Sequence, residues 1–235
     1  MMVGGVSALM LQALHPRVLS GVWDHSNFRD DLQGRLGRTS FFIACTTYGG
    51  TELAEQSIAR VRQVHGHVTG QAPDGQPYSA NDPALLTWVH ASEAYGFLSA
   101  YIAYVDATLT ERDQDRYLAE MAMIAAKLGA PNVPQTRHAL DTYLQSQRPL
   151  LDASDRTREV LRILAQFEPR VMAGLFMRAG SALLPAWAAD MLAVADQAPT
   201  RAALSGDLLR LLAPMARWAL AEEGVVTLAR RRVGR

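Results

Sequence analysis

The sequence predicts an all-α fold, one globular domain of many helices that takes in residues 1–235. Three observations indicate this class. Apolar residues recur at helical spacing along most of the chain. Capping residues, glycine and proline divide that pattern into helix-length pieces. No run of useful length alternates β-branched and polar residues as a half-buried strand would, and there is no internal repeat or domain-length linker.

The first fifty residues divide into a helix, a turn, a loop and a second helix. The apolar start lacks the basic region and cleavage site of a signal peptide, so we expect it to form the first core helix. Pro16 ends this helix, because the residue before a proline is kept out of helical dihedrals. The elements expected here are a helix at 6–14, a short turn at 16–22, a polar loop at 23–31 and a helix at 35–48 that glycines 49 and 50 end.

The next elements lead to the most apolar helix of the chain. Thr51 opens a helix in which His65 replaces a residue of the apolar stripe. The segment 70–79 is rich in glycine, proline and aspartate, which is typical of a tight turn or small hairpin. Asp82 can cap the following helix, and Pro83 lies in its first turn, where a missing N–H costs nothing.

The second half of the chain predicts further helices. Thr110, with Asp113 three residues on, starts one that Gly129 closes. Prolines separate the later helices, and Pro214 is expected to kink the last one. The helices expected here cover about 110–128, 137–147, 155–167 and 170–184, with two more punctuated by Pro185 and Pro199, the last of which ends near residue 230.

Composition and charge restrict the function. The 235 residues are 49% hydrophobic, which is enough for a sizeable core. Lys and Arg total 23, as do Asp and Glu, which removes the usual electrostatic argument for a nucleic-acid partner. No run approaches the ~20 apolar residues that span a bilayer, and the single cysteine, Cys45, excludes an intrachain disulfide framework. We therefore expect a soluble, cytoplasmic protein.

His90 is the first candidate for chemistry, because the phosphate-loop, paired-cysteine, His-Glu-x-x-His, Gly-x-Ser-x-Gly and di-iron Glu-x-x-His motifs are all absent. It lies within the apolar pattern of 81–101. Leu86, Glu93 and Phe97 share its helical face at spacings of four, three and seven residues. An imidazole in that position is either a satisfied core group or a ligand to something held in the core.

Positive charge lies on two similar helical faces. Arg35, Arg38 and Thr39 share one face of the 35–48 helix, and Arg62 lies one turn before His65. A buried arginine is costly without an anion, and an anionic ligand such as a carboxylate would stabilise it. Without such a ligand, Arg35 and Arg38 would pair with surface carboxylates. His65 would donate to a backbone carbonyl.

Several segments, taken in this order, resemble one family. They are ALMLQALHPRVLSGVWDHSNF, GRLGRT, VRQVHGHVTG, PDGQPYSANDPALLTWVHASEAY and DRYLAEMAMIAAKLGAPNVPQT, which together cover about residues 8–143. The resemblance is to the oxygenases that include the bacterial rubber-cleaving latex-clearing proteins and the MpaB-type oxygenase of mycophenolic acid biosynthesis. It implies a helical fold of globin-like character that holds haem b.

The resemblance also implies roles for individual residues. The proximal iron ligand of latex-clearing proteins lies in a Val-His-Ala context, which here surrounds His90. The distal Arg-Leu-x-x-Thr segment matches Arg35 and Thr39. Arg38 stands where those proteins carry a lysine that can occupy the sixth iron position, and an arginine is a poor ligand because it stays protonated. The expected cofactor-binding residues are His90, Arg62 and His65, with His90 on the iron.

These implications give one main hypothesis and two alternatives. We expect a haem-dependent oxygenase that uses dioxygen on a small apolar, isoprenoid-like molecule, with Arg35, Arg38 and Thr39 polarising oxygen or anchoring a propionate. The chain is shorter than the rubber-cleaving enzymes, so a polymer is not the expected substrate. The alternatives are a non-catalytic helical carrier of an apolar ligand, and a non-haem metal enzyme that uses His15, His25 or His65 with a carboxylate.

Overall fold

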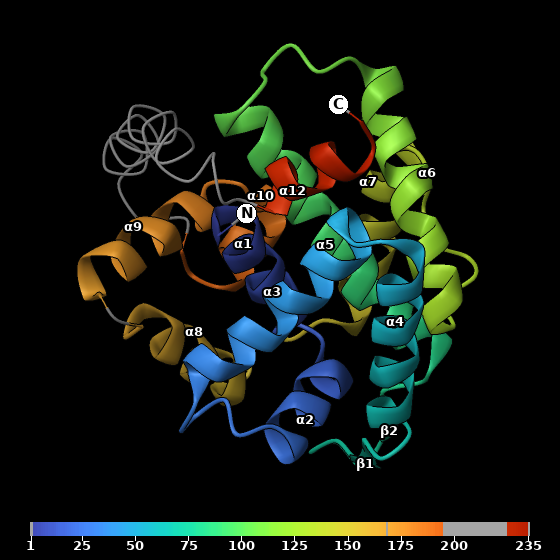
Figure 1. The fold of residues 1–235 in the computed structure, drawn as a ribbon. Coiled ribbons are helices and arrows are strands. Elements are labelled where there is room, and N and C mark those ends of the chain that lie inside the picture. Colours follow the sequence, from blue (N-terminus) through green and yellow to red (C-terminus); the bar gives the residue numbers. More distant parts are fainter. Residues whose placement is uncertain (1, 168, 195–224, 235) are drawn as a thin grey trace.

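The computed structural model describes residues 2–167, 169–194 and 225–234 (Figure 1). It is all-α, as the sequence predicts, and the strands among the described residues form one small hairpin. The elements are α1 (Met2–Gln12), α2 (Pro16–His25), α3 (Leu32–Tyr48), α4 (Thr51–His65), β1 (Thr69–Gln71), β2 (Pro77–Ser79), α5 (Pro83–Tyr104), α6 (Glu111–Leu128), α7 (Arg137–Gln147), the 3-10 turn η1 (Arg148–Leu150), α8 (Asp155–Ala165), α9 (Arg170–Ser181), α10 (Ala186–Met191) and α12 (Val225–Arg232).

α2 corrects one expectation. A short turn was expected at 16–22, but the chain forms a helix there that continues to His25. His15 is extended, with φ −91° and ψ 112°, and Pro16 lies in the first helical turn. The proline that keeps His15 out of helical dihedrals therefore starts a new helix, in which its missing N–H is not needed. Leu19 of this helix is buried in the core.

Most other helix ends follow the capping residues of the sequence. Asp82 and Thr110 cap α5 and α6 with their side chains, and Gly129 ends α6 at φ 112°, a left-handed conformation that suits glycine. α3 begins three residues before its expected start, because the carboxylate of Asp31 accepts from the N–H of Gly34 at 2.8 Å. The helix boundary expected at Pro199 and the kink expected at Pro214 lie outside the described residues.

α1 and α5 cross at the centre of the core. Figure 1 shows α1 in the middle of the molecule, with α8 and α9 to one side and α4 and α6 to the other. A pair of glycines allows the close crossing, since a Cβ atom on Gly96 would lie 2.5 Å from the carbonyl oxygen of Gly4. Leu11, Leu14 and Trp88 are completely buried around this contact. α5 is thereby fixed against α1, with its His90 turn at a defined place.

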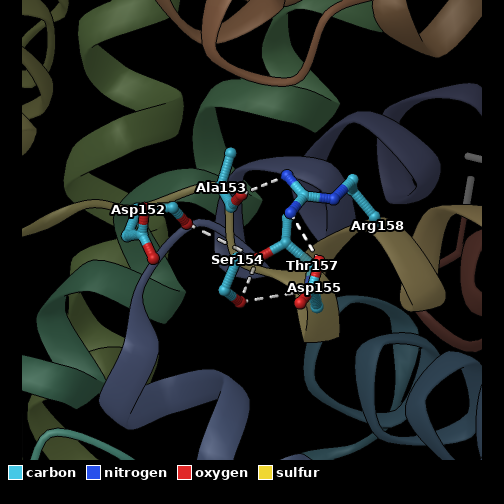
Figure 2. A network of polar contacts seen from close by, with 6 residues as sticks. All are labelled: Asp152, Ala153, Ser154, Asp155, Thr157 and Arg158. Atoms are coloured by element: carbon cyan, nitrogen blue, oxygen red, sulfur yellow. Dashed lines mark hydrogen bonds and ion pairs between the residues drawn. The ribbon is translucent and has the colours of Figure 1, made fainter.

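α8 is fastened to the end of α1. The hydroxyl of Thr157 donates to the carbonyl of Ala13 at 3.0 Å, and the N–H of Asp152 donates to the carbonyl of Leu14 at 2.8 Å. Ser154 caps α8 by accepting from the N–H of Thr157, and Figure 2 shows the polar contacts around this cap. These bonds hold α8 beside α1, where it forms one wall of the candidate site.

The hairpin and the last helix hold α2 and α3 at their ends. β1 and β2 are antiparallel, as the turn-rich segment 70–79 suggests, and the hydroxyl of Tyr78 donates to the carboxylate of Asp24 on α2 at 2.7 Å. Arg232 of α12 donates to the carbonyls of Tyr48 and Gly49, where α3 ends. A cation at that end also suits the helix dipole. No helix among the described residues has the length and apolar character needed to cross a membrane.

Candidate functional site

Two adjoining hollows lie between α1 and α3. The large hollow is about 680 Å³, part of it open to solvent, and is lined by Val6 and Gln12 of α1, Leu36, Thr39 and Ile43 of α3, and Glu93 and Phe97 of α5, among others. The small hollow is about 550 Å³, also partly open, and is lined by Gln12 of α1, Val18 and Leu19 of α2, Phe28, Arg35 and Leu36, and Val160 and Ile163 of α8, among others. The two share a wall formed by Leu9, Gln12, Leu36 and Leu164.

α3 is the outer wall of both hollows. It packs against α4 and α12 rather than closely against α1 and α5, and Cys45 alone among its seventeen residues is buried. A helix of this apolar content usually buries a continuous stripe. The inner face of α3 instead looks onto the hollows, which places Thr39 at the large hollow and Arg35 at the small one.

His90 lies on α5 one turn before Glu93, on the same helical face. Its side chain is half-buried, and neither ring nitrogen has a hydrogen-bond partner in the part of the chain that the structure describes. The carbonyl of the preceding residue, Val89, is taken by the amide of Gln12 at 3.1 Å and by the hydroxyl of Ser92 at 3.1 Å. Burial lowers the pKa of His90 to about 4, so the imidazole is neutral at pH 7 and free to act as a donor ligand.

Glu93 places a carboxyl group on the wall of the large hollow. Among the described residues it has no hydrogen bond or ion pair, including none to His90, for which it was a candidate acceptor. Burial raises the pKa of Glu93 to about 7, because the apolar surroundings disfavour the charged form. Tyr117 of α6 lies within its electrostatic range: burial and then the charge of Glu93 raise the pKa of Tyr117. The large hollow therefore holds a carboxyl group that exchanges its proton near neutral pH.

Arg35 and Thr39 are held on α3 as the helical spacing predicts. Nη1 of Arg35 donates to the hydroxyl of Ser26 at 3.1 Å, and the hydroxyl of Thr39 donates to the carbonyl of Arg35 at 3.2 Å. Burial, and then the charge of Arg38, lower the pKa of Arg35. The nearby His65 is half-buried with an unpartnered Nδ1, and burial followed by the charge of Arg35 lowers the pKa of His65. Arg35 and His65, from different helices, are thus brought together.

The structure places the other two expected arginines away from the hollows. Arg38 is exposed, lies 3.5 Å from the carboxylate of Asp31, and donates to the side chain of Asn27 at 3.3 Å. Arg62 is exposed on α4 and donates to the carbonyl of Lys127 at 3.4 Å. Neither is among the residues that line a hollow.

Gln12 is a site residue that reasoning from sequence did not single out. It lines both hollows, and its amide ties α1 to α5 through Val89. A polar residue in the otherwise apolar stretch 6–14 was the available signal. The residues of α8 that line the small hollow could not be predicted as site residues, because a leucine, an isoleucine and a valine are typical of any helical core.

The non-haem alternative would need His15, His25 or His65 to lie beside other metal ligands. No group of three or more His, Cys, Asp or Glu residues that could hold a metal ion occurs among the described residues. His15 packs on Trp88, with ring centroids 6.1 Å apart, and His25 Nε2 lies 3.1 Å from the carbonyl of Thr69. His15 therefore packs in the core, with a buried Nδ1 that has no partner among the described residues, and His25 ends α2 against the hairpin.

Comparison with known proteins places the chain in a family. The sequence matches the family described as ER-bound oxygenase mpaB/B'/Rubber oxygenase, catalytic domain, over residues 1–218. The chain belongs to this oxygenase family. No curated protein and no solved structure matches the chain. All the elements that line the two hollows lie within the part of the chain that matches the mpaB/rubber oxygenase catalytic domain.

Proposed function

We propose that this member of the mpaB/rubber oxygenase family is a haem-b-dependent oxygenase that acts on a small apolar, isoprenoid-like molecule. The proposed reaction is oxidation, or oxidative cleavage, of a carbon–carbon double bond with dioxygen. The observation that carries the proposal is the state of His90, a half-buried, neutral imidazole without a partner among the described residues. His90 is not among the residues that line the large hollow, but Glu93, one turn along α5, is.

The residues around the large hollow fit a haem. A neutral imidazole nitrogen is a common axial ligand of haem iron. The ring nitrogens of His90 have no partner among the described residues, so the imidazole could take iron as a ligand without losing a hydrogen bond. Apolar side chains such as Val6, Leu36 and Phe97 suit the faces of a porphyrin and keep water away from it. When bound, the haem supplies the redox chemistry with dioxygen that the side chains of the chain lack.

The chain's own residues would bind, orient and manage protons around that group. His90 would hold the cofactor from α5, and Thr39 presents a hydroxyl from α3 across the large hollow. Glu93 offers a carboxyl that can hold or release a proton near neutral pH. Arg38 and Arg62 stay predictions from the sequence, and their exposed positions give them no part in this proposal.

Titration of the purified protein with hemin, followed by absorption spectroscopy, tests the proposal. We expect a Soret band that saturates at one equivalent and changes on reduction with dithionite. His90→Ala should weaken hemin binding by at least about tenfold, because it removes the side chain that would hold the iron. His138→Ala, which removes an exposed histidine of α7, is the matched control and should bind hemin like the wild type. An unchanged haem content and spectrum in His90→Ala would reject the assignment.

A carrier of apolar ligands is the second candidate, and the apolar walls of both hollows favour it. The two functions differ in whether dioxygen is consumed. An oxygenase loaded with hemin should take up dioxygen when small isoprenoid alkenes are added, whereas a carrier should bind the alkene and consume none.

A further inference from the structure

We infer that the small hollow binds a monocarboxylate with an apolar chain, and that Arg35 recognises the carboxylate. The inference deepens the proposed function by naming the class of its substrate, and it rests on that function for the reaction that the molecule undergoes.

Arg35 is a guanidinium that lacks a counter-anion among the described residues. Its hydrogen bond there goes to the neutral hydroxyl of Ser26. The closest acidic residue at the start of α3, Asp31, pairs with Arg38 instead. Burial and the charge of Arg38 both disfavour the cation, yet a guanidinium stays protonated in proteins. Such a cation is stabilised by an anionic ligand.

The rest of the small hollow is apolar. Its walls include Val18, Leu19, Phe28 and Val160, and the other polar side chain, Gln12, already donates to the carbonyl of Val89. The hollow is partly open to solvent, so a ligand chain could reach it from outside. A slot of this kind with one charge suits a molecule that has an apolar body and one anionic end.

The charge around Arg35 favours a carboxylate over a more highly charged head group. Of the described residues that line the small hollow, Arg35 is the one with a charged side chain. His65 beside it is neutral, because burial and Arg35 lower its pKa, and its Nδ1 is buried without a partner. A phosphate or diphosphate would need more cations than this, whereas one guanidinium can hold a carboxylate through two parallel hydrogen bonds.

The shared wall gives the ligand a direction. Leu9 and Leu36 line both hollows. A molecule held at Arg35 would extend its apolar chain along these residues toward the large hollow, where the proposed cofactor lies. Arg35 would thereby determine which carbon atoms of the chain reach the reacting region.

Calorimetric titration of the full chain, with and without hemin, with decanoate and with decanol tests this inference. Decanoate should bind at least about tenfold more tightly than decanol, because a charge-assisted hydrogen bond is lost in the alcohol. Arg35→Met should reduce the ratio of the two affinities to near one and leave decanol binding unchanged. Arg60→Met, on an exposed arginine of α4, is the matched control and should keep the wild-type ratio. Val160→Trp should fill the small hollow and abolish binding of both ligands.

Equal affinities for decanoate and decanol in the wild type, or a ratio preserved in Arg35→Met, would overturn the inference. If Arg35→Met does not fold by circular dichroism, Arg35→Gln gives the same comparison. An Arg35 variant that loses haem but still prefers decanoate would show that Arg35 binds a haem propionate. That result would also overturn the inference. The decanoate preference should persist in His90→Ala, so failure of the proposed cofactor and failure of this ligand site give different results.

Discussion

The candidate site depends on three polar side chains: His90 and Glu93, which have no hydrogen bond or ion pair among the described residues, and Arg35, whose partner is the neutral hydroxyl of Ser26. Each is at least partly buried, and its protonation state at neutral pH follows from that burial and from its own chemistry. His90 stays neutral, Glu93 holds its proton up to about pH 7, and Arg35 remains charged. Side chains of this kind are costly to the fold, which makes them candidates for ligand contacts.

Helical spacing alone placed His90 and Glu93 on one face, and Arg35 and Thr39 on another. The sequence could not show that these side chains lack partners, because that depends on how α1, α3, α5 and α8 pack together. Gln12 was not expected for the same reason: its importance arises from the contact with Val89, 77 residues away.

Replacing Glu93 tests the state of its carboxyl group. The pKa of Glu93 is raised from an ordinary value of 4.5 to about 7 in the folded chain, so the folded state binds this proton more tightly than the unfolded one. Its stabilising contribution is complete below pH 4.5 and is lost as the pH rises through 7. Glu93→Gln should therefore be as stable as the wild type at pH 4, and more stable by roughly 1–2 kcal/mol at pH 8, after allowance for partial exposure.

Urea denaturation of both proteins without hemin, at pH values from 4 to 8, measures this difference. The comparison cancels the other titrating groups, including His90. A difference in the free energy of unfolding that does not vary with pH would show that Glu93 has an ordinary pKa.

At the scale of helices and strands, sequence patterns predicted most element ends but not the hollows. Asp82, Thr110 and Gly129 are caps that act locally, so α5 and α6 could be placed from sequence. Pro16 was misread because a proline can end one helix and begin the next. The hollows arise where α3 stands away from α1 and α5, and no local pattern encodes that distance.

The crossing of α1 and α5 predicts opposite effects on stability for two glycine-to-alanine substitutions, one at Gly96 on α5 and one at Gly5 on α1. In Gly96→Ala the new methyl group would meet the carbonyl oxygen of Gly4, so the helices must separate. We expect a loss of about 1–3 kcal/mol. In Gly5→Ala the methyl group would have no neighbour closer than 4.0 Å, and the better helix propensity of alanine should add up to about 1 kcal/mol.

Thermal denaturation distinguishes the two variants. For a chain of this size each 1 kcal/mol corresponds to about 2–4 °C in Tm. Gly96→Ala should melt below the wild type and Gly5→Ala at or above it. Equal Tm values for Gly96→Ala and the wild type would mean that α1 and α5 do not cross as closely as described.

At the scale of the whole molecule, α1 is the common support of the site. It crosses α5 at the glycine pair, it is bonded to the start of α8 through Ala13 and Leu14, and it faces α3 across both hollows. α3 is fixed at its ends, by the Asp31 cap and by Arg232 from α12. This arrangement leaves the middle of α3 free to form a wall against bound molecules. That residues 1–235 form one domain stays a prediction from the sequence.

The central claim is that His90 would hold the iron of a haem, and chemical rescue tests it most directly. His90→Gly would leave a space at the position of the imidazole. We expect this variant to lose the wild-type Soret band after hemin addition, and to regain it, at one equivalent, when free imidazole is added. His138→Gly, treated in the same way, should show the wild-type band without imidazole. A His90→Gly protein that binds hemin with the wild-type spectrum, and does not respond to imidazole, would contradict the account.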